Sequence, residues 1–175
     1  MRRVIFIGFM GCGKTTLGKK VAKQLNVPFI DADSELERLN QLSVGELFDK
    51  FGESSFREME VDFLMSLENQ GDFVLATGGG MPCFDRNMDL LNQLGTTYYL
   101  DRSAKELANR LKNAKTQRPL LKGLADDDLL EFIELKLAQR DEYYKQSQVI
   151  LNRDDQTAAD IIRLNHLLHL PRKTQ

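Results

Sequence analysis

Eight residues near the amino terminus, Gly8 to Thr15, form a pattern that binds phosphate groups. The run Gly-Phe-Met-Gly-Cys-Gly-Lys-Thr matches G-x-x-x-x-G-K-S/T at every fixed position, with cysteine where a small serine is more usual. Glycines let successive backbone N–H groups turn inward on phosphate oxygens, and a helix that begins at the loop points its positive end at them. In this pattern Lys14 reaches the β- and γ-phosphates and the Thr15 hydroxyl ligates Mg²⁺. The loop therefore predicts a nucleotide-phosphate site, with a plain anion-binding loop as the alternative. The residues predicted to bind the nucleotide here are Gly11, Cys12, Gly13, Lys14, Thr15 and Thr16.

Two carboxylates, Asp31 and Asp33, follow the second apolar segment of the chain. Residues two apart lie on the same side of an extended chain, and ligands bind at the carboxyl ends of strands in open α/β sheets. One carboxylate can face Mg²⁺, here assigned to Asp31 with Thr15, and the other can face a hydroxyl that accepts phosphate. A helix N-cap at Asp33 explains that residue equally well from the sequence.

A basic stretch covers residues 102–122. It holds seven lysines and arginines against one acid, Glu106. Such a run is usually a solvated surface, but its place in a slightly acidic chain also fits a surface that faces an anion. Its basic residues are Arg102, Lys105, Arg110, Lys112, Lys115, Arg118 and Lys122.

The elements that must position these residues alternate between strands and helices. Short β-branched and aromatic runs predict strands, apolar residues at helical spacing predict helices, and Ser-x-x-Glu patterns predict where three helices begin. Alternating strands and helices predict an α/β sheet covered by helices on both faces. The strands are expected at 4–7, 28–31, 73–76, 97–100 and 149–151. The helices are expected at 14–25, from near Val44, from near Phe56, after Ser103, at 129–144 and at 157–168.

Length and composition limit the classes of protein that remain. The chain has 175 residues, 42% hydrophobic and 29% charged, with a net charge of −2. These values fit one globular domain and argue against a disordered or nucleic-acid-coating protein. No apolar run approaches the ~20 residues that span a bilayer, and the short run after Met1 lacks a cleavage site. Two isolated cysteines exclude a disulfide framework, and a cytoplasmic protein is expected.

The other motifs decide between the proteins that use a phosphate loop. A GTPase would carry N-K-x-D, which the sequence lacks, and the D-x-x-G spacing at 49–52 lies in a stretch with helical spacing. A motor-type ATPase needs a longer chain. A compact small-molecule kinase fits the length best.

Five motifs in a fixed order make the resemblance specific. The phosphate loop is followed by Asp-x-Asp, by Gly-Glu-x-x-Phe-Arg-x-x-Glu at 52–60, by three glycines at 78–80 and by Arg-Pro-Leu at 118–120. With Arg140 before Tyr143, this order resembles the shikimate kinase family over about residues 3 to 152. The resemblance implies a three-layer α/β/α fold of the nucleoside-monophosphate-kinase type, with a central five-stranded parallel sheet and a mobile lid.

The resemblance also implies which residues bind the acceptor. Shikimate carries one carboxylate, which a planar guanidinium pairs bidentately, and Arg57 and Arg140 match the family's substrate arginines. Asp33 matches the residue that hydrogen-bonds the reacting hydroxyl and takes its proton. Phe48 and Phe56 match aromatics beside the substrate, although packing in the core is the commoner role of phenylalanine. The residues assigned to shikimate are Asp33, Arg57, Glu60, Gly78, Gly79, Gly80 and Arg140.

On the nucleotide side, Arg118 matches the lid arginine that contacts the phosphates, and Arg110 is the candidate to stack on adenine. Lys14, Asp33 and Arg118 are the expected catalytic set. ATP is the expected co-substrate with Mg²⁺, and shikimate the acceptor. The alternatives are a gluconate or nucleoside-monophosphate kinase of the same fold, and a nucleotide-binding module without turnover.

One kinase domain is expected over residues 1–170. Its core covers 1–111 and 127–170, its substrate-binding helical region 32–62 and its lid about 112–126, and residues 171–175 form a frayed tail. A monomer that binds neither nucleic acid nor membrane is implied.

Overall fold

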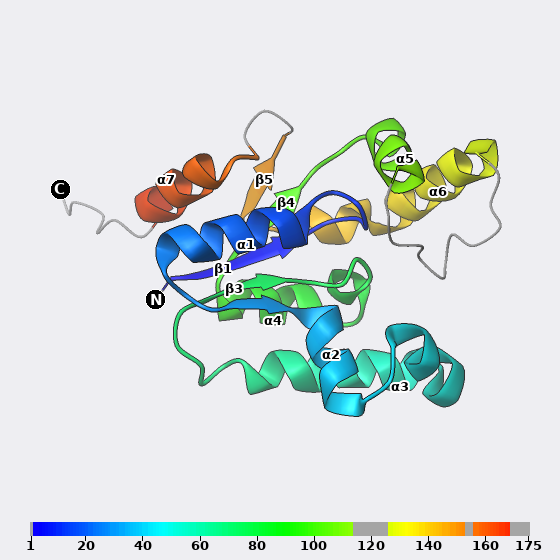
Figure 1. Ribbon diagram of the computed structural model, residues 1–175, viewed down its shortest axis with the longest axis horizontal. Helices are drawn as coiled ribbons and strands as arrows, with labels where there is room; N and C mark the ends of the chain where they lie inside the picture. The colour runs from blue at the N-terminus through cyan, green and yellow to red at the C-terminus, as the bar shows by residue number, and fades with distance from the viewer. Residues whose placement is uncertain (1, 114–125, 153–155, 169–175) are drawn as a thin grey trace.

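The computed structural model describes residues 2–113, 126–152 and 156–168. In this part of the chain, five strands form one parallel sheet in the order β2-β3-β1-β4-β5 (Figure 1). This confirms the predicted α/β class and the number of strands. The strands are β1 (Arg3–Ile7), β2 (Phe29–Asp31), β3 (Phe73–Ala76), β4 (Thr96–Leu100) and β5 (Val149–Leu151).

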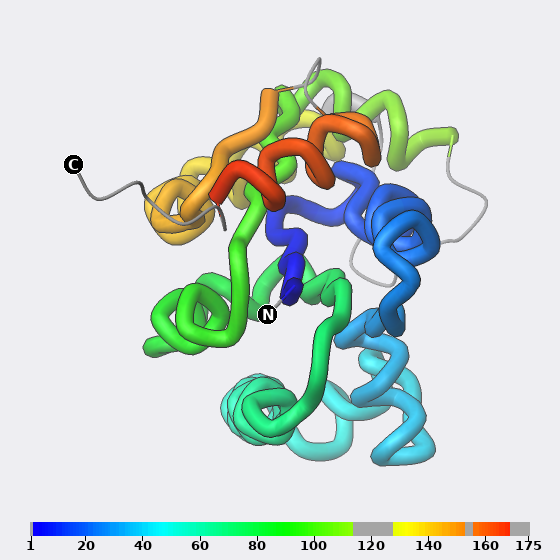
Figure 2. The backbone as a smooth tube through the Cα atoms, turned by 90° about the vertical axis from the view of Figure 1, so that its left-hand side faces the viewer, coloured from blue at the N-terminus to red at the C-terminus, as the bar shows by residue number. Residues whose placement is uncertain are grey.

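Helices cover both faces of this sheet (Figure 2). The first face is covered by α1, α5, α7 and the start of α6, and the second by α2, α3 and α4. The helices are α1 (Lys14–Leu25), α2 (Ala32–Asn40), α3 (Val44–Ser66), α4 (Asn87–Leu94), α5 (Ala104–Lys112), α6 (Asp126–Tyr144) and α7 (Ala158–Leu168), with a 3-10 turn η1 (Met81–Cys83).

The central strand β1 explains why its sequence is an uninterrupted apolar run. Val4 and Phe6 enter the core on the first face, and Ile5 and Ile7 enter the core on the second. Alternate side chains of a strand point to opposite faces, so a strand covered on both sides needs apolar residues at every position. β1 ends at Ile7, and the phosphate loop begins at the next residue, so the loop is anchored to the buried centre of the sheet.

The predicted helix starts are confirmed at two of the three Ser-x-x-Glu patterns. Ser43 and Ser103 each form a complete capping box with the glutamate three residues later. The second helical segment predicted from near Phe56 is present, but it begins directly after Gly52, and Ser55 lies inside it instead of capping it. The break falls instead at Gly52, whose φ of 77° and ψ of 170° suit a residue without a side chain. A bend set by one glycine thus replaces a second capped start.

None of the helices in the described ranges is long and apolar enough to cross a membrane. The expected lid, except for Lys112, Asn113 and Asp126, and the expected tail at 171–175 lie outside the described residues.

Candidate active site

The phosphate loop joins β1 to α1, with its glycines in conformations that side chains resist. Gly11 has a φ of +81° and Gly13 a φ of +112°, and α1 begins at Lys14 directly after them. The Lys14 ammonium donates hydrogen bonds to the backbone oxygens of Gly8 at 2.7 Å and Phe9 at 3.1 Å. The Lys14 ammonium therefore lies against the phosphate loop.

Thr15 and Asp31, the two residues assigned to the metal, touch each other. The Thr15 hydroxyl donates to Asp31 Oδ2 at 2.8 Å, which joins the first turn of α1 to the end of β2. Asp31 also caps α2 by accepting from the backbone N–H of Ser34. The cap therefore belongs to Asp31, and Asp33 lies within the first turn of α2. The helix-cap explanation of Asp33 is wrong.

The triple glycine leaves space for two of the predicted acceptor residues, Asp33 and Arg57. A β-carbon at Gly78 would lie 2.5 Å from Asp33 Oδ1, and one at Gly80 would lie 2.8 Å from a terminal nitrogen of Arg57. Gly78 and Gly80 therefore lie against two predicted shikimate ligands. A side chain at Gly78 or Gly80 would collide with Asp33 or Arg57, so glycine is needed here for close packing and not only to form a turn.

Gly79 joins the acceptor side to the phosphate loop. A β-carbon there would lie 3.3 Å from the backbone nitrogen of Met10 and 3.6 Å from a terminal nitrogen of Arg140. The phosphate loop, the triple glycine and Arg140, the second arginine predicted to bind the substrate, thus meet at one point. Parallel strands bring them there because the carboxyl ends of β1 and β3 lie side by side.

Arg57 is held on two sides by carboxylates of α3. Its guanidinium donates to Glu60 at 2.8 Å and to Glu53 at 2.9 Å. It also lies 5.6 Å from the ring centres of both Phe48 and Phe56. Phe56 is buried in the core, so it packs there and also lies beside the Arg57 guanidinium. The ion pair allows Glu60 to hold the Arg57 guanidinium in place.

The two partners of that pair titrate differently. Burial raises the pKa of Glu60 to about 7, and the neighbouring Arg57 only partly lowers it. Burial lowers the pKa of Arg57, but the Glu60 and Glu53 carboxylates outweigh it and raise that pKa above its ordinary value. Arg57 therefore stays charged while Glu60 gains or loses a proton near neutrality.

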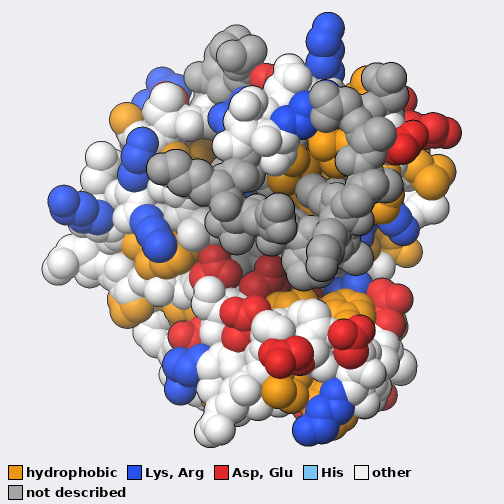
Figure 3. All heavy atoms as spheres, turned by 45° about the vertical axis from the view of Figure 1, so that its right-hand side comes forward, with side chains coloured by type: hydrophobic (Ala, Val, Ile, Leu, Met, Phe, Trp, Pro, Cys, Tyr) orange, Lys and Arg blue, Asp and Glu red, His pale blue; other side chains and the backbone are white. Residues whose placement is uncertain are grey.

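Acidic side chains gather on the surface that α2 and α3 form, below the centre of the view in Figure 3. An anionic acceptor that approaches this side meets repulsion from exposed carboxylates. Buried or half-buried arginines are the groups that can offset it.

Arg140 comes from α6. Its guanidinium lies 5.5 Å from the centre of the Phe9 ring in the phosphate loop. One turn later, the Tyr144 hydroxyl donates to the backbone oxygen of Gly79 at 2.6 Å. Tyr144 is fully buried, and burial raises the pKa of its hydroxyl, so it remains a donor. Sequence reasoning missed this tyrosine, although its spacing of four from Arg140 places both on one helix face.

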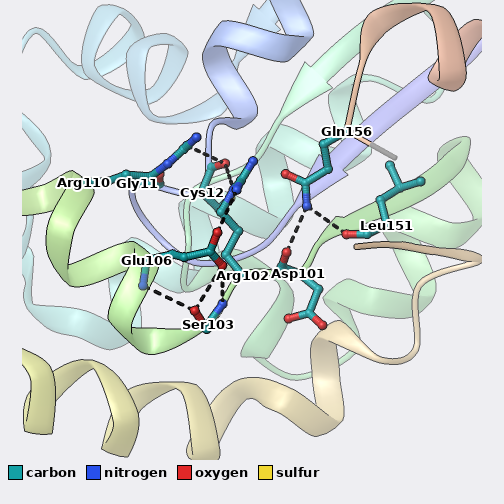
Figure 4. A network of polar contacts seen from close by, with 9 residues as sticks. All are labelled: Gly11, Cys12, Asp101, Arg102, Ser103, Glu106, Arg110, Leu151 and Gln156. Atoms are coloured by element: carbon teal, nitrogen blue, oxygen red, sulfur yellow. Dashed lines mark hydrogen bonds and ion pairs between the residues drawn. The ribbon is translucent and has the colours of Figure 1, made fainter. Parts of the chain in front are cut away.

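The basic stretch meets the phosphate loop from outside (Figure 4). Arg110 donates to the backbone oxygens of Gly11 at 3.3 Å and Cys12 at 3.2 Å, and Arg102 donates to the same Cys12 oxygen at 3.2 Å. Part of this stretch is therefore not simply a solvated surface. Thr16 is exposed in the first turn of α1, and Arg118 lies outside the described residues.

Comparison with known proteins identifies the family. A model of the shikimate kinase family matches residues 10–167. The chain belongs to the shikimate kinase family. The shikimate kinase of Bacteroides fragilis is 45% identical over 175 residues, which cover 97% of this chain and 98% of that protein.

Solved structures of the family confirm the predicted fold. The crystal structure of shikimate kinase from Bacteroides thetaiotaomicron has a TM-score of 0.89 and 44% identity, covering 97% of this chain and 99% of that chain. Shikimate kinase from Acinetobacter baumannii in complex with shikimate has a TM-score of 0.81 and 31% identity, covering 100% of this chain and 96% of that one. Family membership favours the shikimate kinase prediction over the gluconate and nucleoside-monophosphate kinase alternatives.

Proposed function

We propose that the chain transfers the γ-phosphoryl group of ATP to the 3-hydroxyl of shikimate, giving shikimate 3-phosphate and ADP. The observation that carries this proposal is the contact at Gly79. There the phosphate loop, the triple glycine and Arg140 come within 3.6 Å of the position of a β-carbon. A phosphoryl donor and a carboxylate-bearing acceptor can therefore be held next to each other, which phosphoryl transfer chiefly requires.

On the donor side, backbone N–H groups of the loop hold the phosphates and Lys14 neutralises their charge. Its ammonium already lies at the loop, bonded to backbone oxygens, and has only to exchange these for phosphate oxygens. We assign Arg118 to the charge on the moving phosphoryl group and Arg110 to adenine, from the family resemblance. The position of Arg110 beside the loop supports a place on the nucleotide side.

Thr15 and Asp31 would hold Mg²⁺. A hydroxyl and a carboxylate are the hard oxygen ligands that this ion prefers, and it commonly binds to only one or two protein groups together with substrate phosphates. Their oxygens lie 2.8 Å apart, so both can face one site. When bound, the ion would neutralise charge on the β- and γ-phosphates.

On the acceptor side, Arg57 and Arg140 would pair the shikimate carboxylate and Gly79 would let the ring approach the backbone. Asp33 would align the reacting hydroxyl and accept its proton. The contact of its carboxylate with Gly78 places Asp33 beside the triple glycine, as this role requires. Gly78 and Gly80 give room to Asp33 and Arg57, and Glu60 orients Arg57 through their ion pair.

ADP release measured with shikimate, gluconate, a nucleoside monophosphate or no acceptor tests the function. We expect release to depend on shikimate and on Mg²⁺, and to stop with EDTA. Release with gluconate alone would support the rival kinase, and ATP binding without release would support a non-catalytic module.

We further propose that residues 1–170 form one kinase domain, which acts in the cytoplasm as a monomer and binds neither nucleic acid nor membrane. Light scattering tests the monomer, for which a mass near 20.0 kDa is expected.

A further inference from the structure

The outer side of the phosphate loop carries a contact that the proposed reaction has not used. Arg102 and Arg110 both donate to the backbone oxygen of Cys12, each at 3.2 Å (Figure 4). Arg102 lies 90 residues from Cys12 in the sequence, just after β4. A backbone carbonyl oxygen has two lone pairs, and here two guanidinium groups from outside the loop occupy them.

The geometry of the peptide bond connects this contact to phosphate binding. The oxygen of Cys12 and the N–H of Gly13 belong to the same planar trans peptide, so they point in opposite directions. The protein contains no cis peptide among the described residues. A donor that holds the Cys12 oxygen outward therefore turns the Gly13 N–H inward, toward the site that the loop forms for phosphate.

Arg102 is better braced for this task than Arg110. Its side chain is only 9% exposed and pairs with Glu106 at 3.4 Å. Glu106 is itself fixed by the capping box with Ser103 at the start of α5. Arg110 is exposed in the last turn of the same helix, away from the capping box that fixes Glu106. If Arg110 turns to adenine, Arg102 still holds the peptide.

We propose that Arg102 is a positioning residue of the nucleotide site, which orients the Cys12–Gly13 peptide so that its N–H faces the phosphates. The proposal rests on the proposed function only in taking the loop as the ATP site. Arg102 acts through the backbone and touches no substrate. It should therefore affect binding of phosphates and leave shikimate binding unchanged.

The test uses inorganic tripolyphosphate, which has the phosphates of ATP but neither ribose nor base. Calorimetry measures the Kd of tripolyphosphate and of ATP for the wild-type chain and for Arg102→Met, which keeps an unbranched side chain as far as the position of Nε without the donors or the charge. We expect both Kd values to rise by a similar factor, about tenfold, as for a lost hydrogen bond from a charged donor. Arg163→Met, an equal charge change at an exposed position of α7, should bind both ligands as the wild type does.

An unchanged Kd for tripolyphosphate would overturn the proposal, as would a loss confined to ATP, which would place Arg102 on the base or ribose. An increase of the KM for shikimate to the same extent would indicate general damage and would also contradict it.

If Arg102→Met does not fold, Arg102→Lys replaces it. Lysine lacks the planar fork by which Arg102 bonds the Cys12 oxygen and Glu106 through two different nitrogens, so about threefold weaker tripolyphosphate binding is expected and wild-type affinity would overturn the proposal. A wild-type chain that binds tripolyphosphate but releases no ADP with shikimate would instead refute the proposed function.

Discussion

At the scale of single residues, Asp33 is the group on which the proposed chemistry most depends. Its carboxylate lies against Gly78, and the helix cap that could have explained it belongs to Asp31. We expect Asp33→Asn to lower kcat by about 100-fold or more, the range for a positioned acid or base, with little change in Tm. Steady-state kinetics measure this, and Asp62→Asn, an exposed acid of α3, is the matched control. Near-normal turnover in Asp33→Asn would remove it from the reaction.

Glu60 gives a prediction on pH at the same scale. Its pKa is near 7 in the folded chain against 4.5 ordinarily, so between these values the folded state holds a proton that the unfolded state has lost. The stability due to this group is present below pH 4.5 and is lost as the pH rises through 7. Relative to wild type, Glu60→Gln should thus gain about 1 to 3 kcal/mol of unfolding free energy between pH 5 and pH 8.

Urea unfolding at the two pH values measures that difference, because other titrating groups are common to both chains. Glu58→Gln, an exposed glutamate on the same helix, serves as control and should show no such gain. A difference between Glu60→Gln and wild type that is independent of pH would contradict a raised pKa at Glu60.

At the scale of elements, the stretch between β3 and η1 forms a wall of the site that contacts both the phosphate loop and the predicted acceptor residues. Because a β-carbon at Gly78 would come within 2.5 Å of Asp33, Gly78→Ala must displace that carboxylate. We expect kcat to fall by about tenfold to 100-fold while the KM for ATP stays near its wild-type value. Gly71→Ala is the control, since no atom lies within 4 Å of its added methyl group and its φ is not positive. Equal kinetics in the two variants would show that the wall tolerates a side chain.

At the scale of the whole molecule, the two halves of the site lie at the carboxyl ends of the strands, and the expected lid would close over both. The family resemblance places this lid at about 112–126, where Lys112, Lys115 and Lys122 are trypsin sites, whereas Arg118 precedes a proline and is not cut. We expect limited proteolysis there to slow several-fold with ADP and shikimate together, because closure excludes water and protease alike. Mass spectrometry of the fragments locates the cuts. Cleavage at the same rate with and without ligands would argue against a closing lid.

Local features of the chain were predictable because their causes lie within a few residues. The capping boxes at Ser43 and Ser103 depend on a partner three positions away. The strands around β1 follow from apolar runs that a doubly covered sheet requires. The Ser55 pattern failed because the same local signal also occurs inside a helix, where Gly52 had already set the bend.

The sequence by itself determined the phosphate loop, the five strands with most of the helices between them and, through its joint motifs, the family; it did not predict α4. Tertiary structure alone decided that Tyr144 holds the oxygen of Gly79 and that Arg102 holds the oxygen of Cys12. The physical reason is separation along the chain, 65 residues in the first pair and 90 in the second. Short-range patterns carry no information on such contacts, which form only when packing of helices on the sheet brings distant backbone oxygens within reach of their donors.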